Sequence, residues 1–166
     1  HVDPENDEQI EITEDLEEEI KNRIVMVRHG YGIQIYGKDE ATGIVSKYAG
    51  QWDRDSKHGD GHCVYKTGCE YRGNFVYNEF HGMGEFKWKR TEIENAYHTY
   101  RGEWNKGKME GEGEFSHSSG HSSKPIFKNN MCNYDDRLYF SPFMEMNEIE
   151  AVIKRIGLRE IEIAKD

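Results

Sequence analysis

The residues best suited to chemistry in this chain are histidines and cysteines, which together could bind a metal ion. His58 and His62 are four residues apart, but on an extended strand this spacing separates them by about 13 Å, too far for one ion. His62 together with Cys63 or Cys69 leaves an adventitious zinc site as an open alternative. The sequence contains neither Cys-x-x-Cys nor His-Glu-x-x-His. We therefore expect no metal site and no cofactor.

The patterns that usually support catalysis are also missing. The sequence has no nucleophile elbow, no phosphate-binding loop and no context that would pair two carboxylates. Gly30 and Gly32 do not form a phosphate-binding loop, because no helix is predicted directly after them. We therefore expect no catalytic residues, and the sequence predicts that the protein is not an enzyme.

A phrase that occurs three times indicates which elements position the remaining side chains. Each copy reads Tyr-x-Gly-x-Trp or Tyr-x-Gly-x-Phe and is followed by two glycines separated by one residue. The copies are Tyr48–Trp52 with His58–Gly61, Tyr71–Phe75 with His81–Gly84, and Tyr100–Trp104 with Glu110–Gly113. The first glycine of each copy lies nine residues before the first glycine of its second half. Tandem repetition of this kind is typical of solenoids, and a repeated unit rarely carries one unique active site.

The spacing between the copies defines the length of the unit. Successive second halves are 23 or 29 residues apart, so the unit has 23 residues and alternate connections contain six more. A half-copy lies upstream at His29–Gly32. The extra residues fall near Lys38–Val45 and Lys89–Ala96, and a degenerate further unit begins at Ile126–Asn130.

The residue types within each unit predict two short strands with one buried face. Tyr48, Gly50 and Trp52 are two residues apart, so on a strand they share a face. We expect this aromatic and glycine face to be buried, with a ring from a neighbouring strand packed against each glycine. The opposite face is polar apart from Val64, Val76 and Met83. In the half-copy, Ile33 and Ile35 point the same way as the polar residues and require a cover, which one of the terminal helices could provide.

The repeated phrase resembles the MORN repeat, the "membrane occupation and recognition nexus" motif, over about Gly30–Phe115. The resemblance implies a mainly β fold, an elongated single-layer antiparallel β-hairpin solenoid that forms a groove. Here it would be flanked by an N-terminal and a C-terminal α-helix. The chain departs from the pattern in its longer alternate connections and in Glu110, which replaces a histidine. Proteins with such repeats include junctional membrane proteins, phosphoinositide kinases and cytoskeletal or ciliary scaffolds, so the resemblance implies binding and organisation.

The chain divides into four parts. Residues 1–24 form an acidic leader with a short helix over Glu14–Asn22, for which the alternative is a solvated charged segment. Residues 25–116 hold the repeats, and 117–145 hold a loop and the degenerate last repeat. Residues 146–166 form a C-terminal helix with Asn147 as N-cap and Gly157 as its stop. We expect this helix to cap the solenoid, and the alternative is that its apolar face docks a partner.

Charge and cysteine content limit the partners and the compartment. The 166 residues carry a net charge of −10, of which the leader contributes −8 through ten acidic and two basic residues. The repeat region is nearly neutral, which argues against nucleic acid as a partner. Three cysteines without a framework spacing favour a reducing compartment. We expect an intracellular protein, cytoplasmic or cytoskeleton-associated or part of an organellar complex, and no segment is apolar enough to span a membrane.

We expect the function to be that of a scaffold or adaptor, a subunit of a larger cytoskeletal or organellar assembly. It would bind a helix or an extended segment of a protein in the groove of the repeats. The residues expected to contact this partner are Val64, Arg72, Val76, Met83, Lys87, Arg101 and Glu103. The alternative is attachment to a membrane or a phosphoinositide through Lys87, Lys89 and Arg90, the one compact basic cluster. Self-association through the terminal repeats is a further possibility.

Overall fold

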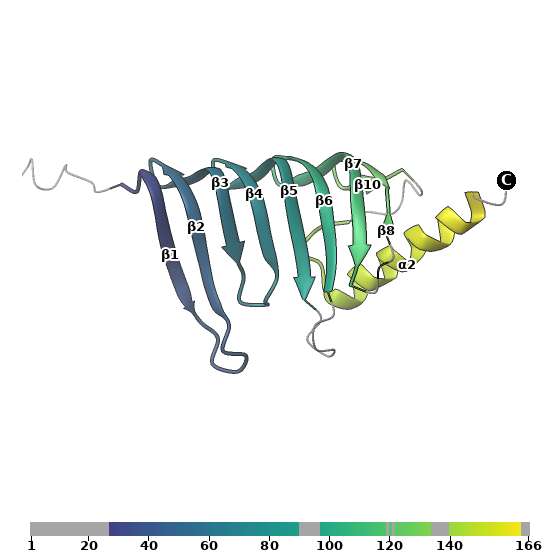
Figure 1. The fold of residues 1–166 in the computed structure, drawn as a ribbon, viewed down its shortest axis with the longest axis horizontal. Coiled ribbons are helices and arrows are strands. Elements are labelled where there is room, and N and C mark those ends of the chain that lie inside the picture. Colours follow the sequence, from purple (N-terminus) through teal and green to yellow (C-terminus); the bar gives the residue numbers. More distant parts are fainter. Residues whose placement is uncertain (1–26, 90–96, 119, 121, 134–139, 164–166) are drawn as a thin grey trace, which may run out of the picture.

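The computed structural model describes residues 27–89, 97–118, 120, 122–133 and 140–163, with side chains described as far as Ile156. It is mainly β, a single antiparallel sheet built from consecutive hairpins with one helix near its C-terminal end (Figure 1). The strands are β1 (Gly30–Lys38), β2 (Val45–Asp53), β3 (Ser56–Val64), β4 (Glu70–Val76), β5 (Glu79–Lys89), β6 (Tyr97–Asn105), β7 (Lys108–His117), β8 (Ser122–Ser123), β9 (Ile126–Lys128) and β10 (Met131–Cys132). The helix is α2 (Met146–Ile163).

The order of the strands follows the chain, as a row of hairpins requires. The sheet runs β1-β2-β3-β4-β5-β6-β7-β9-β10, and β8 pairs with β7 beside β9. The predicted repeat copies correspond to the hairpins β2–β3, β4–β5 and β6–β7, and the half-copy corresponds to β1. The degenerate further unit is the short hairpin β9–β10. The expected helix over Glu14–Asn22 lies outside the described residues.

Two-residue turns join the strands of each hairpin at one end of the strands, and longer connections lie at the other end (Figure 1). Both central residues of each tight turn have a positive φ, which is the signature of a type I′ turn. The four turns are Arg54-Asp55, Tyr77-Asn78, Lys106-Gly107 and Asn129-Asn130. The first predicted insertion lies in the β1–β2 connection, where the Asp39 carboxylate accepts hydrogen bonds from the backbone amides of Ala41 and Thr42. The second, Lys89–Ala96, lies outside the described residues from Arg90 onward.

The buried face is the aromatic and glycine face that the sequence predicts. Tyr48, Tyr71 and Tyr100 are fully buried, and Trp52, Phe75 and Trp104 are buried beside them. Each tyrosine ring lies over a glycine of the adjacent strand: a Cβ at Gly61, Gly84 or Gly113 would overlap the ring of Tyr48, Tyr71 or Tyr100 respectively. The expected packing of rings against strand glycines is therefore confirmed.

The C-terminal part of the chain packs onto the aromatic face at the β7–β10 end of the sheet. The Phe140 ring is buried and lies 5.1 Å from the Phe115 ring and 5.2 Å from the Trp88 ring, measured between centroids. The indole Nε1 of Trp88 donates a 2.9 Å hydrogen bond to the carbonyl oxygen of Pro142. The predicted apolar stripe of α2 is confirmed, because Ile149, Val152 and Ile156 are all buried in the same core.

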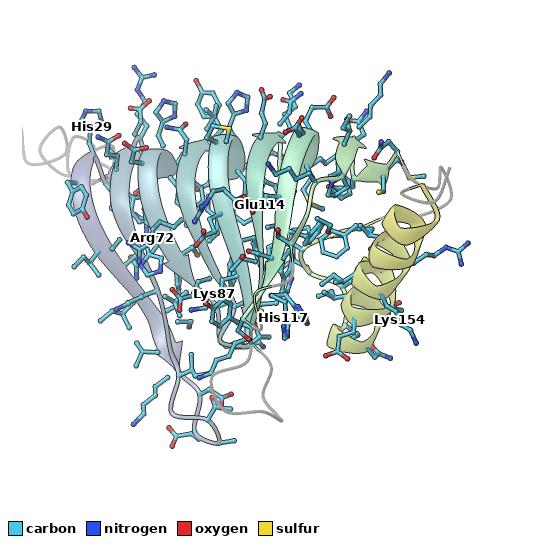
Figure 2. The ribbon with its side chains drawn as sticks, turned by 45° about the vertical axis from the view of Figure 1, so that its right-hand side comes forward. His29, Arg72, Lys87, Glu114, His117 and Lys154 are labelled. Atoms are coloured by element: carbon cyan, nitrogen blue, oxygen red, sulfur yellow. The ribbon has the colours of Figure 1, made fainter. Side chains whose placement is uncertain are left out.

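Two expectations about the C-terminal helix are wrong. The helix begins at Met146, and it is Glu148 whose carboxylate accepts from the backbone amide of Glu145, so Asn147 is not the N-cap. Gly157 does not end the helix, because a glycine inside a helix costs only about 1 kcal/mol and helix-forming residues follow it. Of the two terminal helices that could cover Ile33 and Ile35, α2 lies at the end of the sheet opposite to β1 and does not do so (Figures 1 and 2), and the N-terminal one lies outside the described residues.

Candidate functional site

The two faces of the sheet differ in what they can offer a partner. The aromatic face is closed, because its rings pack edge to face against one another and leave the three repeat tyrosines without exposed surface. Burial raises the pKa of Tyr48 to about 12 and raises the pKa of Tyr71 and of Tyr100 further still. These phenols therefore stay neutral and act as core residues. The polar face is the surface that the hairpins present to solvent.

The polar face is organised in rows that run across the strands. The central row follows the paired residues of neighbouring strands, so its side chains lie next to one another on one face. Its members, from β2 to β7, are Ala49, His62, Arg72, Glu85, Arg101 and Glu114. Figure 2 shows Arg72, Lys87 and Glu114 on the same side of the sheet. Because the repeats place equivalent residues on alternate strands, acidic and basic side chains alternate along this row from β4 to β7.

Ion pairs hold the central row in place. The guanidinium of Arg101 donates two hydrogen bonds to Oε2 of Glu85, from Nε at 3.1 Å and from the terminal nitrogen. On the β3 side, Nε2 of His62 lies 2.8 Å from Oε2 of Glu70, and the Arg72 guanidinium lies 3.4 Å from Nδ1 of the same imidazole. These side chains are exposed or half-buried, so each pair contributes no more than about 1 kcal/mol to stability. Their effect is to orient the charges.

The second row lies toward the long connections and is less charged. It runs through Lys47, Val64, Glu70, Lys87, Thr99 and Ser116. The hydroxyls of Thr99 and Ser116 are 2.6 Å apart and hydrogen-bond across β6 and β7. The ammonium of Lys87 lies 4.3 Å from the centre of the Tyr97 ring, a cation–π distance, and Lys87 pairs across the strands with Glu70. The Lys87 ammonium is therefore turned toward an aromatic ring.

The third row lies toward the tight turns. Among the described residues, its Met83 is the one large apolar side chain that is exposed in the middle of the polar face. Met83 is 65 % exposed and pairs with Glu103 across β5 and β6. In the same row, Asp60 of β3 pairs with Asn74 of β4. A flexible thioether at this position is suited to contact an apolar side chain of a partner.

The structure brings most of the predicted partner-binding residues together. Arg72, Arg101, Lys87, Glu103, Met83 and Val64 lie on the polar face of β3 to β6. Val76 is half-buried and lies apart from them, beside the Tyr77-Asn78 turn. In the alternative lipid-binding cluster, Lys87 and Lys89 lie two residues apart on the same strand, and Arg90 lies outside the described residues.

The sequence interpretation missed the partners that orient the two arginines. Glu85 lies between Arg72 and Arg101 in the central row, and His62 lies on the other side of Arg72. The signal that could have found them is the repeat itself, because Glu85 and Glu114 occupy equivalent positions, as Arg72 and Arg101 do.

The geometry of β3 separates His62 from Cys63, one of the two pairs considered for a zinc site. His62 lies on the polar face and contacts Glu70, whereas Cys63 is the next residue and is buried on the aromatic face. In the part of the chain that the structure describes, no group of three or more histidine, cysteine or carboxylate side chains is placed to hold a metal ion. The described helical residues likewise include no segment that is long and apolar enough to cross a bilayer.

Comparison with known proteins identifies the repeats. Residues 48–70, 71–90 and 100–122 match the family described as MORN repeat. Alsin from Rattus norvegicus, from Mus musculus and from Homo sapiens are each 33 % identical to this chain over 84 residues, which is 51 % of this chain. The chain spans 5 % of the length of these relatives. The matched segments begin at Tyr48, Tyr71 and Tyr100, so the hairpins β2–β3, β4–β5 and β6–β7 are three MORN repeats.

Proposed function

Because three MORN repeats build strands β2 to β7, we propose that this chain is a non-catalytic scaffold or adaptor that binds a protein partner on its polar face. The observation that carries the proposal is the contrast between the two faces. The aromatic face is filled by its own rings, while the polar face presents oriented charges around the exposed Met83. A surface that mixes fixed arginines with an exposed apolar side chain has the composition of a protein-binding site.

The spacing of the charges indicates what kind of segment would fit. Adjacent strands of a sheet are about 4.8 Å apart, so Arg72 and Arg101, two strands apart, are separated by about 10 Å along the row. A helix that carries acidic side chains two turns apart, or an extended segment in the polyproline II conformation with acidic side chains three residues apart, would meet both guanidiniums. Glu85 between them would repel a third acidic group, so the partner would be neutral or basic at that point.

Affinity purification from the native organism with paired variants tests this proposal. The double variant R72Q/R101Q removes two positive charges from the polar face, and K106Q/K108Q removes two from the edge at the Lys106-Gly107 turn. We expect proteins captured by the wild type and by K106Q/K108Q, but lost with R72Q/R101Q, to be the partners. Equal capture by all three folded proteins would contradict binding through the central row.

The alternative of attachment to a membrane or a phosphoinositide depends on Lys87, Lys89 and Arg90. Basic residues attract an anionic surface by about 1 kcal/mol each, and the Lys87 ammonium already lies over the Tyr97 ring. Sedimentation with vesicles of phosphatidylcholine, with and without phosphatidylinositol bisphosphate, distinguishes the two functions. Salt-sensitive cosedimentation that is lost in K87E/K89E, but kept in R72Q/R101Q, would favour the lipid.

We further propose that the chain acts inside cells as a subunit of a larger cytoskeletal or organellar assembly. Support for this comes from the family, whose repeats serve interactions, and from a sheet whose described residues offer a broad surface for a partner. Sedimentation velocity at several concentrations measures whether the isolated chain associates with itself. Gel filtration of a native lysate measures whether it elutes with a larger complex.

A further inference from the structure

The strand β1 has the features of the second strand of a repeat, but the first strand of that repeat is absent from the described residues. Gly30 has a φ of +82°, in the same left-handed region as Gly59, Gly82 and Gly111 at +60° to +68°. Nε1 of Trp52 donates to the carbonyl oxygen of Gly32 at 3.4 Å, as Nε1 of Trp104 donates to that of Gly84 at 3.1 Å. Among the described residues, β1 pairs only with β2.

Gly32 shows what is missing at this edge. Its equivalents Gly61, Gly84 and Gly113 have no room for a Cβ, because a tyrosine of the preceding strand covers each of them. A Cβ at Gly32 would contact only the Trp52 ring, at 3.5 Å, which is an ordinary van der Waals distance. Within the described chain, therefore, no aromatic ring covers Gly32 as a tyrosine ring does in every complete repeat. The Arg28 guanidinium lies 4.0 Å from the centre of the Trp52 ring and donates to Oε1 of Gln34, so an added ring would pack against this guanidinium.

On β1, the side chains that point to the polar face of the sheet are apolar, unlike those of any other strand in the described sheet. Tyr31, Ile33 and Ile35 are 76 %, 69 % and 61 % exposed. In the sheet they lie opposite Gln51, Ala49 and Lys47 of β2, and their outer side has no described neighbour. A long edge strand with exposed apolar side chains is a template for pairing with another strand.

We propose that the outer edge of β1, which no described strand pairs with, binds an extended segment of another polypeptide, which adds an antiparallel strand and supplies the missing aromatic ring. The register follows from the complete repeats, in which Gly61 pairs with Gly50 and Cys63 pairs with Tyr48. By the same register, the added strand places a glycine opposite Gly32 and a tyrosine opposite Gln34. Backbone hydrogen bonds would provide affinity and the ring site would provide specificity.

The residues beside the ring define the rest of the recognition sequence. Between its tyrosine and its glycine, the added strand has one residue that faces Ile33, and the residue before its tyrosine faces Ile35. Apolar pairs across strands are favourable by about 0.2–1 kcal/mol each, so these two residues of the partner are apolar. The partner segment therefore reads apolar-Tyr-apolar-Gly. This edge site is separate from the polar-face site around Arg72 and Arg101.

A synthetic peptide based on the sequence of β2 tests the proposal. The fluorescently labelled probe carries the sequence of Val45–Asp53 with Lys47→Val and Ala49→Ile, and two added lysines keep it in solution. Fluorescence anisotropy measures its binding to the full chain. We expect saturable binding that weakens at least tenfold when the tyrosine of the probe is replaced by alanine. The protein variant Gly32→Leu, which fills the ring site, is expected to weaken binding by a similar factor.

Two further variants separate the edge from other surfaces. Ile33→Lys places a charge beside the added strand and is expected to weaken binding, whereas Met83→Lys makes the same change on β5 and is expected to leave it unchanged. Thermal unfolding of each variant confirms that it is folded. No saturable binding, equal binding of the alanine probe, or equal binding to the folded Gly32→Leu variant would overturn the proposal. Loss of binding in R72Q/R101Q would assign the peptide to the polar face instead and would also overturn it.

Discussion

Asn78 and Lys57 join two successive hairpins through a reciprocal pair of hydrogen bonds. The backbone amide of Lys57 donates to Oδ1 of Asn78 at 2.8 Å, and the backbone amide of Asn78 donates to the carbonyl oxygen of Lys57 at 3.0 Å. Asn78 is the second residue of the β4–β5 turn, and Lys57 is the second residue of β3. The pair therefore links the tight turn of one repeat to the strand of the repeat before it.

The same pair recurs along the edge of the sheet. Asp55 makes it with Arg28, and Asn130 makes it with Met109. In each case the side-chain oxygen of the turn residue accepts one hydrogen bond and its backbone amide donates the other. At the β6–β7 turn, Gly107 keeps the backbone bond to Phe80 at 2.9 Å but has no side chain to complete the pair. We call this pairing the turn latch. The full pair occurs at three of the four described tight turns and connects neighbouring hairpins.

Replacing Gly107 with asparagine is expected to complete the turn latch and to stabilise the protein. The φ of Gly107 is +75°, close to the +71° of Asn78, and asparagine tolerates this conformation. The new hydrogen bond to the amide of Phe80 is worth about 0.5–1.5 kcal/mol, which corresponds to a rise in melting temperature of about 1–6 °C. Thermal unfolding by circular dichroism measures it. Gly107→Ala is the control and is expected to lower stability by about 1 kcal/mol through strain at positive φ.

The substitution Asn78→Ala is expected to destabilise the protein by about 2 kcal/mol. About half of this is the lost hydrogen bond to Lys57 and half is the cost of alanine in the left-handed region, φ +71°. Asn78→Gly removes the hydrogen bond but relieves the backbone, so we expect a loss of about 1 kcal/mol. Urea denaturation measures both. Equal losses for alanine and glycine would contradict this division.

Adding a methyl group to the glycines of the repeat is expected to have opposite effects at Gly84 and Gly32. At Gly84 the Cβ would overlap the buried Tyr71 ring, so Gly84→Ala is expected to cost about 1–3 kcal/mol. At Gly32 the φ is not positive and the Cβ has room, so Gly32→Ala is expected to be neutral or to stabilise by up to about 1 kcal/mol. Urea denaturation compares the two. A large loss at Gly32 would show that the ring site is already occupied.

Asp55 is expected to make the stability of the protein depend on pH in acid. The backbone amide of Arg28 and its guanidinium hold the pKa of Asp55 below its ordinary value of 3.8. Because the folded pKa is depressed, this contribution is present above pH 3.8 and is lost as the pH falls through the folded pKa. In Asp55→Asn the amide oxygen still accepts from Arg28 but does not titrate. Melting temperatures between about pH 6 and pH 2 are expected to fall less steeply in the variant than in the wild type.

Much of the buried face could be predicted because strand geometry is local. Tyr48, Tyr71 and Tyr100 alternate with polar residues and precede glycines by two, so their burial follows from the alternation of side chains along a strand. The apolar stripe of the C-terminal helix is equally local, and Ile149, Val152 and Ile156 are buried as the pattern predicts. The predicted N-cap at Asn147 and stop at Gly157 are wrong, because Gly157 has neighbours that favour the helix and Glu148 provides the bond at its start.

For the candidate site, the sequence predicts which residues share the polar face, but not which side chains contact one another. The alternation placed Arg72, Met83 and Arg101 on one exposed face, and the structure agrees. Their contacts depend on which residues oppose one another in neighbouring strands. Glu85 meets Arg101 because β5 and β6 pair in one particular register. The pairing of β4 with β5 contains a register shift between Gly73 and Asn74. A shift of one residue would turn Glu85 to the other face.

The sequence by itself determined the repeat, the number of hairpins in the matched region and the face of each strand that is buried, since these depend on residue types a few positions apart. Only the tertiary structure decided that Asn78 meets Lys57 and that no described tyrosine fills the ring site beside Gly32. It also decided that Ile33 stays uncovered by the C-terminal helix. These contacts join residues about twenty or more positions apart, and strand register and hairpin order set them, so no local pattern could have specified them.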